Sequence, residues 1–230
     1  RDLTPYMKYL RNAKMRIEQS AQSGLDEVEY SELLERSETA MFTHSWKYLS
    51  FLESLLPSAS PNHLLCRQDG ALIGALPVFT TQTDECFVAN SLPFFGSHGG
   101  TVLDSTASES AHNNLLESFE KLAQSFPTHT ATLIEPPDLG NARRQAPDGF
   151  SVSDSRIGQI TEIPTDIAEG STREKLLGRF EKRARNSVNR SLRGELTLSP
   201  ADSEQSLDEV YAIHVKSMVA IGGPPKPTGF

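Results

Sequence analysis

Residues 63–80 read His-Leu-Leu-Cys-Arg-Gln-Asp-Gly-Ala-Leu-Ile-Gly-Ala-Leu-Pro-Val-Phe-Thr. Apolar side chains dominate both halves of this stretch, and an Asp-Gly pair, a strong signal for a tight hairpin turn, separates them. The sequence therefore predicts a β-hairpin. Residues 63–67 form its first strand, residues 68–70 its turn and residues 71–80 its returning strand.

Helical and extended patterns surround the hairpin. Before it, apolar residues recur at steps of three and four over residues 41–56, which predicts an amphipathic helix that ends at Pro57. After it, the patterns predict a strand, a glycine-rich loop, a short extended segment, a helix, a buried strand and a last strand. In that order, these six elements lie at residues 87–93, 94–100, 101–103, 115–126, 131–134 and 156–163. The order of elements indicates an α/β domain.

Different elements are predicted for the two ends of the chain. Residues 3–36 are polar with scattered apolar positions, so we expect a helical N-terminal extension within residues 1–40. A linker at residues 164–170 precedes a basic helix that begins at Ser171 or Thr172 and ends at Gly194. A short strand at residues 195–199 and a helix between Leu207 and Val219 follow. Because the chain starts with Arg1 and stops in a Gly/Pro-rich turn, we expect a fragment of a longer protein.

Charge and hydropathy exclude several classes of protein. The net charge of −8 argues against a general nucleic-acid coat, yet residues 173–193 hold eight basic and two acidic side chains. That segment is therefore +6 and the remainder −14. No apolar run is long enough to span a bilayer and no signal peptide is visible, so we expect a cytoplasmic protein. The alternative location is the inner face of the membrane. Cys66 and Cys86 are interpreted as core thiols.

The basic helix is the most informative candidate site. Guanidinium forks match phosphate oxygens, so its donors could bind phosphate or pyrophosphate. A solvated helix face, whose side-chain stems cover the apolar stripe, explains the pattern equally well. The candidate residues are Lys182, Arg183, Arg185, Asn186 and Arg190.

Four further features are weaker candidates. The loop at residues 94–100 could cradle an anion with its backbone N–H groups, or it could be a tight turn. His98 is either a general acid or base or a solvated side chain, and Trp46 is either a ligand wall or part of the core. His214 is either a site residue or a core histidine. The candidate ligand-binding residues here are Trp46, Phe95, Gly96, Ser97, His98, Gly99, His214 and Lys226.

Nothing in the sequence identifies catalytic residues. No paired-carboxylate, Ser/His/Asp or metal-ligand pattern is present, so no metal is expected and the catalytic residues stay unknown.

The succession of motifs resembles the FemAB-like and BioF2-like acyltransferases of the GNAT superfamily over residues 41–230. Ser-Trp-Lys-Tyr-Leu at 45–49 precedes Gly-Ala-Leu-Pro-Val-Phe at 74–79 and Ser-Leu-Pro-Phe-Phe-Gly at 91–96. Phe-Glu-Lys-Arg-Ala-Arg-Asn-Ser-Val at 180–188 follows, and then a helix with His214 and Met218.

The resemblance implies an α/β fold of the α+β type. Its mixed, largely antiparallel central sheet would be flanked by helices, in tandem domains at residues 41–168 and 169–230, with the second incomplete. It also implies a transferase that forms an amide bond between an acyl or aminoacyl group and an amine of a cell-envelope (peptidoglycan) precursor or an amino sugar. The phosphorylated donor would be acyl-CoA or aminoacyl-tRNA, with no tightly bound cofactor. The GNAT pyrophosphate loop, Arg/Gln-x-x-Gly-x-Gly/Ala, is missing here, which leaves the use of CoA open.

Three hypotheses make different structural predictions. A transferase places residues 94–100, the basic helix and Lys226 in one shared cleft, at the junction of the two domains. A non-catalytic GNAT-like module that binds RNA or a lipid headgroup turns the basic helix outward and binds less tightly in salt. A simple connector pairs Arg183 and Arg185 with carboxylates of their own domain.

Overall fold

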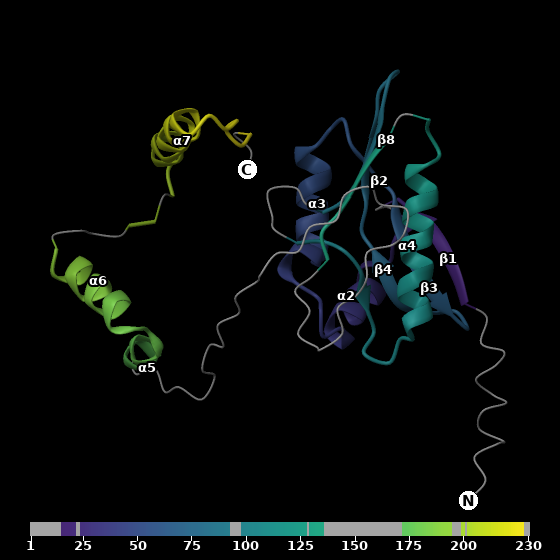
Figure 1. Ribbon diagram of the computed structural model, residues 1–230, viewed down its shortest axis with the longest axis horizontal. Coiled ribbons are helices and arrows are strands. Elements are labelled where there is room, and N and C mark those ends of the chain that lie inside the picture. The colour runs from purple at the N-terminus through teal and green to yellow at the C-terminus, as the bar shows by residue number, and fades with distance from the viewer. Residues whose placement is uncertain are drawn as a thin grey trace, which may run out of the picture. The chain divides into compact units, whose positions relative to one another are not determined.

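The computed structural model describes residues 15–21, 24–92, 98–127, 129–135, 172–194, 199–200 and 202–227 (Figure 1). They belong to two compact units, one before residue 155 and one from there onward. Each unit is described by itself.

The predicted hairpin is present and forms the centre of the first unit. Strand β3 (His63–Gln68) pairs antiparallel with β4 (Ala71–Leu76). Asp69 and Gly70 connect them with positive φ angles of 51° and 92°. Two positive φ angles in a row are what a two-residue turn of the mirror-image type requires, and Asp-Gly is well suited to supply them. The Asp-Gly signal therefore identified this element correctly.

The returning strand is shorter than predicted. It ends at Leu76, and β5 (Phe79–Gln82) belongs to a different sheet. Pro77 has no N–H to continue the ladder, and the N–H of Val78 donates instead to Nδ1 of His63 over 3.1 Å. The break divides one sequence run between two sheets.

The described strands form two sheets of four strands each. The first has the order β1-β3-β4-β7, with β1 at Met15–Ser20 and β7 at Val102–Leu103. The second has the order β2-β5-β6-β8, with β2 at Ser60–Pro61, β6 at Phe87–Ser91 and β8 at His129–Leu133. All described pairings are antiparallel except the parallel pair of β6 and β8. The mixed, largely antiparallel sheet structure predicted from the sequence is confirmed.

The prediction of a purely helical segment before residue 36 is wrong. Met15–Ser20 is strand β1, which pairs with β3 and places Ile17 opposite Cys66. Within the described part of residues 1–40, the α-helix is α2 (Glu27–Arg36), where Tyr30 and Leu33 are fully buried. The free edge of β3 offers a row of backbone partners, and that tertiary pairing outweighs the weak helical pattern of residues 15–20.

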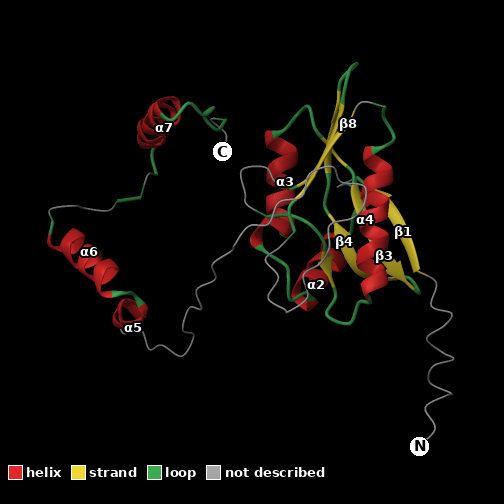
Figure 2. Cartoon of the chain, viewed as in Figure 1, coloured by secondary structure: helices red, strands yellow, loops and turns green. Residues whose placement is uncertain are grey.

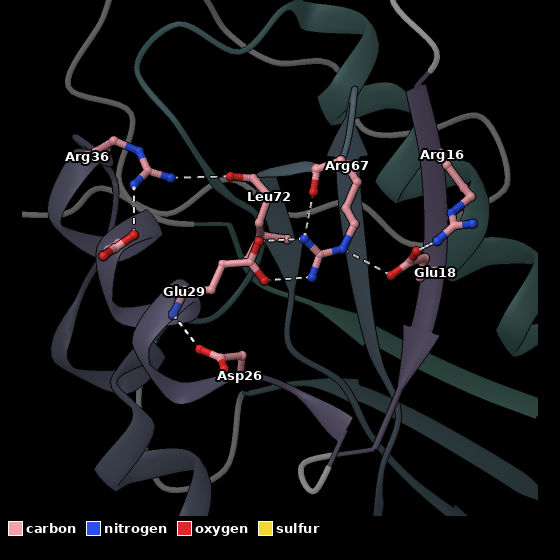
Figure 3. A network of polar contacts seen from close by, with 9 residues as sticks. Arg16, Glu18, Asp26, Glu29, Arg36, Arg67 and Leu72 are labelled. Carbon is pink, nitrogen blue, oxygen red and sulfur yellow. Dashed lines mark hydrogen bonds and ion pairs between the residues drawn. The ribbon is translucent and has the colours of Figure 1, made fainter.

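A network of charges connects these two elements to the hairpin (Figure 3). Nη1 and Nη2 of Arg67 on β3 bind the two carboxylate oxygens of Glu29 on α2 at 2.5 and 2.6 Å. Nε of Arg67 contacts Glu18 Oε2 on β1 at 3.1 Å. The hydrogen bonds from Arg67 hold the pKa of Glu29 below its usual value. A two-point fork of this kind fixes orientation as well as distance.

A second contact connects the end of α2 to the strand region. Nε of Arg36 lies 2.7 Å from Oδ2 of Asp104, and its Nη2 donates to the carbonyl of Leu72. Hydrogen bonds from Thr106, and then the one from Arg36, lower the pKa of Asp104 to about 2.

Helices cover both faces of the strands, as Figure 2 shows. Helix α2 and helix α3 (Trp46–Leu55) pack on one side, and α4 (Glu109–Ala123) packs on the other. Successive residues of β3 point to opposite sides, so Leu65 joins one hydrophobic core while Leu64 and Cys66 join the other. The core beside α2 and α3 includes Tyr30, Leu33, Leu49, Leu52 and Leu72, and the core beside α4 includes Leu76, Phe87, Ala111, Leu115 and Phe119.

The second unit consists of three described helices. These are α5 (Thr172–Arg179), α6 (Lys182–Arg193) and α7 (Glu204–Ala220). The single helix predicted from residue 171 or 172 to Gly194 is therefore two helices. Glu181 is extended, with φ −59° and ψ 153°, and interrupts the helical backbone. Gly194 does follow the last helical residue of α6, as predicted.

Several expected elements lie outside the described residues. They are the strand at 156–163, the linker at 164–170 and, apart from Ser199, the strand at 195–199. Among the helices that the structure describes, none is both long and apolar enough to cross a membrane. The domain boundaries at residues 40 and 168 stay predictions.

Candidate functional site

The basic face of α6 is the first candidate site. Lys182, Arg183, Asn186, Ser187 and Arg190 line a shallow, open hollow on the helix surface. They are spaced one, three or four residues apart and so share one side of the helix. The apolar residues Ala184, Val188 and Leu192 recur every four residues on another side. The structure thus brings together four of the five basic-helix candidates.

Arg185 is the candidate that the hollow leaves out. It belongs to the same helix and carries the same charge, but it does not line this surface. Arg193, at the end of the helix, does not line it either. The connector hypothesis required Arg183 and Arg185 to pair with carboxylates, and among the described residues neither has such an ion pair.

Electrostatics explains why this basic face needs a counter-charge. The first turn of α6 contains Lys182, Arg183 and Arg185 and no acidic residue, so these cations lie at the positive end of the helix dipole. Each such placement costs roughly 0.3–1 kcal/mol. Glu181, the N-cap, is the acidic residue nearest to this turn in the sequence, and no described carboxylate forms an ion pair with α6. An anionic ligand at this face would supply the missing charge.

The end of α7 is the second candidate site. Nε2 of His214 accepts a hydrogen bond of 3.0 Å from the backbone N–H of Lys226, so the structure brings these two predicted residues together. The hydroxyl of Tyr211 donates to the carbonyl of Lys226 over 2.9 Å. Tyr211 and His214 are half-buried and lie one helical turn apart, with ring centroids 6.2 Å apart.

The glycine-rich loop differs from the predicted anion nest in its described part. Gly99 donates its N–H to the carbonyl of Ile134 at 2.9 Å, and Gly100 donates to Oγ of Ser91 at 3.0 Å. Thr101 donates its N–H to Glu135. These three successive N–H groups are already used within the protein, so they cannot cradle a ligand. Phe95, Gly96 and Ser97 lie outside the described residues.

His44 holds the same loop from the other side. Its Nε2 contacts the carbonyl of Gly99 at 3.0 Å, and its Nδ1 accepts from the N–H of Met41 at 3.0 Å. The latter bond requires an unprotonated Nδ1, so Nε2 is the donor to Gly99. His44 is fully buried, and burial lowers its pKa. His98 is half-buried, and its Nδ1 is buried without a hydrogen-bond partner among the described residues.

A chain of polar groups continues from this loop. Nδ1 of His112 on α4 lies 3.0 Å from Oγ1 of Thr101, which in turn donates to Oε2 of Glu135 at 3.1 Å. Because the hydroxyl hydrogen of Thr101 is donated to Glu135, its oxygen acts as acceptor toward His112. Nδ1 of His112 is therefore protonated and donates to Oγ1 of Thr101. These hydrogen bonds connect α4, the loop and the second residue after β8.

Trp46, a candidate ligand-binding residue, lies beside the first hydrophobic core. Trp46 is half-buried, packs against the core beside α2 and α3, and lies 6.4 Å from the ring of Tyr30. Its contacts are those of a core residue.

The described residues contain no group of three or more His, Cys, Asp or Glu side chains that could hold a metal ion.

Comparison with known proteins rests on structure. No family model matches the sequence, and no curated protein matches it. The crystal structure of FemX matches 92% of this chain with a TM-score of 0.53 and 12% sequence identity. The chain therefore has a fold similar to that of FemX. It spans about half the length of FemX, 52% of that chain.

Two other solved structures are similar at a lower level. A tandem GNAT protein from the clavulanic acid biosynthesis pathway matches 57% of this chain and 40% of its own, at 16% identity and a TM-score of 0.36. A ribosomal-protein-alanine N-acetyltransferase from Brucella melitensis biovar Abortus 2308 matches 63% of this chain and 100% of its own. That match has the same identity and TM-score, 16% and 0.36.

Within this FemX-like fold, sequence reasoning missed several polar residues. His44, Thr101 and His112 are single polar residues in apolar or loop surroundings, and no local pattern marks them. Tyr211 carried a usable signal, because it precedes His214 by three residues and therefore shares its face of α7.

Proposed function

We propose that the protein is an N-acyl- or aminoacyltransferase that forms an amide bond on a cell-envelope precursor or an amino sugar. Its donor would be acyl-CoA or aminoacyl-tRNA. The observation that carries this proposal is the basic face of α6, which has no partner carboxylate among the described residues and belongs to a chain with a fold similar to that of FemX. Both donors contain phosphate groups, which match this face in charge and geometry.

The proposed reaction needs no covalent enzyme intermediate. A neutral amine attacks the carbonyl carbon of the thioester or ester, a C–N bond forms, and the C–S or C–O bond to the donor breaks. The amine loses one proton, and the leaving thiolate or alkoxide gains one. Most of the rate gain would come from holding donor and amine in register, and from donors to the developing oxyanion. Lys182, Arg183, Asn186 and Arg190 would bind the donor's phosphates and so fix its reactive end.

The test is a binding titration of the whole chain with acetyl-CoA, with charged tRNA and with uncharged tRNA. The double variant Arg183→Ala/Arg190→Ala should bind the preferred donor at least about tenfold more weakly, because each arginine loses a charge-assisted contact. Arg185→Ala/Arg193→Ala is the matched control, since it removes the same two charges from the same helix outside the hollow. Equal losses in the double variant and the control would contradict a defined site.

The same titration separates the two classes of donor and the alternative function. Saturable acetyl-CoA binding supports an acyl-CoA enzyme, and preference for charged over uncharged tRNA supports an aminoacyltransferase. The alternative is a non-catalytic module that holds RNA or a lipid headgroup through α6. It predicts equal binding of both tRNA forms, a steep fall in affinity with salt, and no amide product with glucosamine or a muropeptide amine.

A further inference from the structure

The chain reverses direction immediately after α7. Gly223 donates its N–H to the carbonyl of Met218 at 2.9 Å, and Gly222 has a φ of +75°. This is a glycine-based helix ending, in which the chain turns back along the helix. Residues 223–227 therefore return toward the preceding turns of α7, and this brings Lys226 to residues 12 and 15 positions earlier.

The returning segment can be held by very few backbone groups. Residues 224–227 read Pro-Pro-Lys-Pro, and proline has no N–H, so the single N–H of these four residues belongs to Lys226. That N–H donates to Nε2 of His214, and the carbonyl of the same residue accepts from Tyr211. Both polar backbone groups of Lys226 are thus bound by two side chains of α7. We call this pair of hydrogen bonds the Lys226 clamp.

The clamp fixes the backbone of one particular residue. Prolines on both sides restrict the neighbouring φ angles, and the two hydrogen bonds determine where the Cα of Lys226 lies. Fixing a backbone in advance removes an entropic cost that a ligand would otherwise have to meet on binding. A lysine held in this way is prepared to contact an anion, since its ammonium offers three donors to phosphate oxygens.

We propose that Tyr211 and His214 are positioning residues that hold Lys226 as a ligand for a phosphate group of the donor. This inference rests on the proposed function, which supplies the phosphorylated donor. Lys226 makes the contact, and Tyr211 and His214 act through it.

The test uses the whole chain labelled with ¹⁵N-lysine and inorganic pyrophosphate as the probe. The Lys226 amide signal, assigned by its loss in Lys226→Ala, reports both the clamp and the ligand. Tyr211→Phe and His214→Ala should each weaken pyrophosphate binding about five- to tenfold while Lys226 is still present. His214→Gln should restore binding, because its amide oxygen can accept the same N–H. Lys216→Ala, an exposed lysine of the same helix, is the matched control.

Several outcomes would overturn the inference. One is pyrophosphate affinity that Lys226→Ala leaves unchanged. Another is affinity that Tyr211→Phe and His214→Ala leave unchanged, and a third is affinity that His214→Gln fails to restore. These results are separable from the proposed function. Pyrophosphate binding that depends on the clamp, without any amide product, would reject the transferase alone. Amide formation that Lys226→Ala, Tyr211→Phe and His214→Ala all leave unchanged would reject the clamp alone.

Discussion

Gly99 occupies a position where no side chain fits. A Cβ atom placed there would lie 2.0 Å from the carbonyl oxygen of Ser91 and 2.8 Å from Cβ of Leu92. The obstacle at Ser91 is backbone, which cannot rotate aside as a flexible side chain can. Since Gly99 also bonds to Ile134 and His44, its displacement would disturb both neighbours.

Gly99→Ala should therefore lower the free energy of unfolding by about 2–4 kcal/mol, as expected for overpacking that shifts a hydrogen-bonded backbone. The measurement is the midpoint of urea unfolding. Gly178→Ala is the control, because no other atom lies within 4 Å of the place that a methyl group would take at this position of α5. That variant should be neutral or slightly stabilising, as alanine favours helix over glycine. A neutral Gly99→Ala would contradict the close packing of this loop.

His63 makes stability depend on pH. Burial lowers the pKa of His63 to about 4, from 6.5 for a free side chain, while its Nδ1 accepts the N–H of Val78. The unfolded chain thus binds a proton more readily than the folded one. The stability from neutral His63 is complete above about pH 6.5 and is lost as pH falls toward 4.

We expect the free energy of unfolding to fall by roughly 2–3 kcal/mol over this interval because of His63. Urea unfolding at several pH values would measure it. In His63→Asn, whose amide oxygen can replace Nδ1 as acceptor, the fall should be smaller. An identical pH profile in the wild type and the variant would assign the acid sensitivity to other groups.

At the scale of single elements, Arg67 holds three parts of the first unit together. Its fork binds Glu29 on α2 while its Nε contacts Glu18 on β1, and all three side chains are 21–31% exposed. Removing the arginine leaves two carboxylates close to each other with no cation between them. The attachment of β1 and α2 to the hairpin depends on this contact.

Arg67→Met should lower stability by about 1–3 kcal/mol, since the stem is kept but the charge-assisted bonds are lost. Arg16→Met is the matched control, because Arg16 is 68% exposed and contacts only Glu18 among the described carboxylates. It should change stability by less than about 0.5 kcal/mol. A double-mutant cycle of Arg67→Met with Glu29→Gln isolates the pair, and a coupling energy near zero would refute the proposed attachment.

The elements that could be predicted are those with a strong local signal. The Asp-Gly turn at 69–70 marked the hairpin, and the apolar face of α4 marked that helix. Strand β1 could not be found in this way, because its pairing with β3 connects residues about fifty positions apart. The break at Pro77 was missed, although the missing N–H of a proline is a local signal for it.

In the candidate site, too, only the features with a local sequence signal could be predicted. Clustered charge revealed the basic face of α6, but only the folded helix separates Arg185 from the four residues that line the hollow. The loop glycines suggested an anion nest, whereas the groups that occupy their N–H donors belong to Ile134 and Ser91, which lie outside the loop in the sequence. Long-range hydrogen bonds of this kind leave no local pattern.

At the scale of the whole molecule, the hydrophobic cores lie in the first unit, whereas most of the large exposed apolar side chains among the described residues lie in the second. Leu33 and Phe119 are fully buried in the first unit. Among the described residues, none on α6 or α7 is buried, and Ile213 is 67% exposed. The cooperative unfolding of the chain should therefore report mainly on the first unit.

Leu33→Ala and Phe119→Ala should lower the free energy of unfolding by about 2–5 kcal/mol, because each leaves a cavity in a core. Ile213→Ala should change it by less than about 0.5 kcal/mol. The comparison requires one denaturation series followed by tryptophan fluorescence, since Trp46, the single tryptophan, packs against the first core. A large loss in Ile213→Ala would show that α7 contributes to the same cooperative structure.

The Lys226 clamp closes on backbone atoms, so its two hydrogen bonds do not depend on which side chain stands at this position. Any residue except proline retains the N–H and carbonyl on which the clamp depends. Position 226 is thus suited to saturation mutagenesis, in which the chemistry of one side chain varies on an unchanged loop. Ligand preference could be re-engineered there, from anions toward cations or aromatic groups, without a new scaffold.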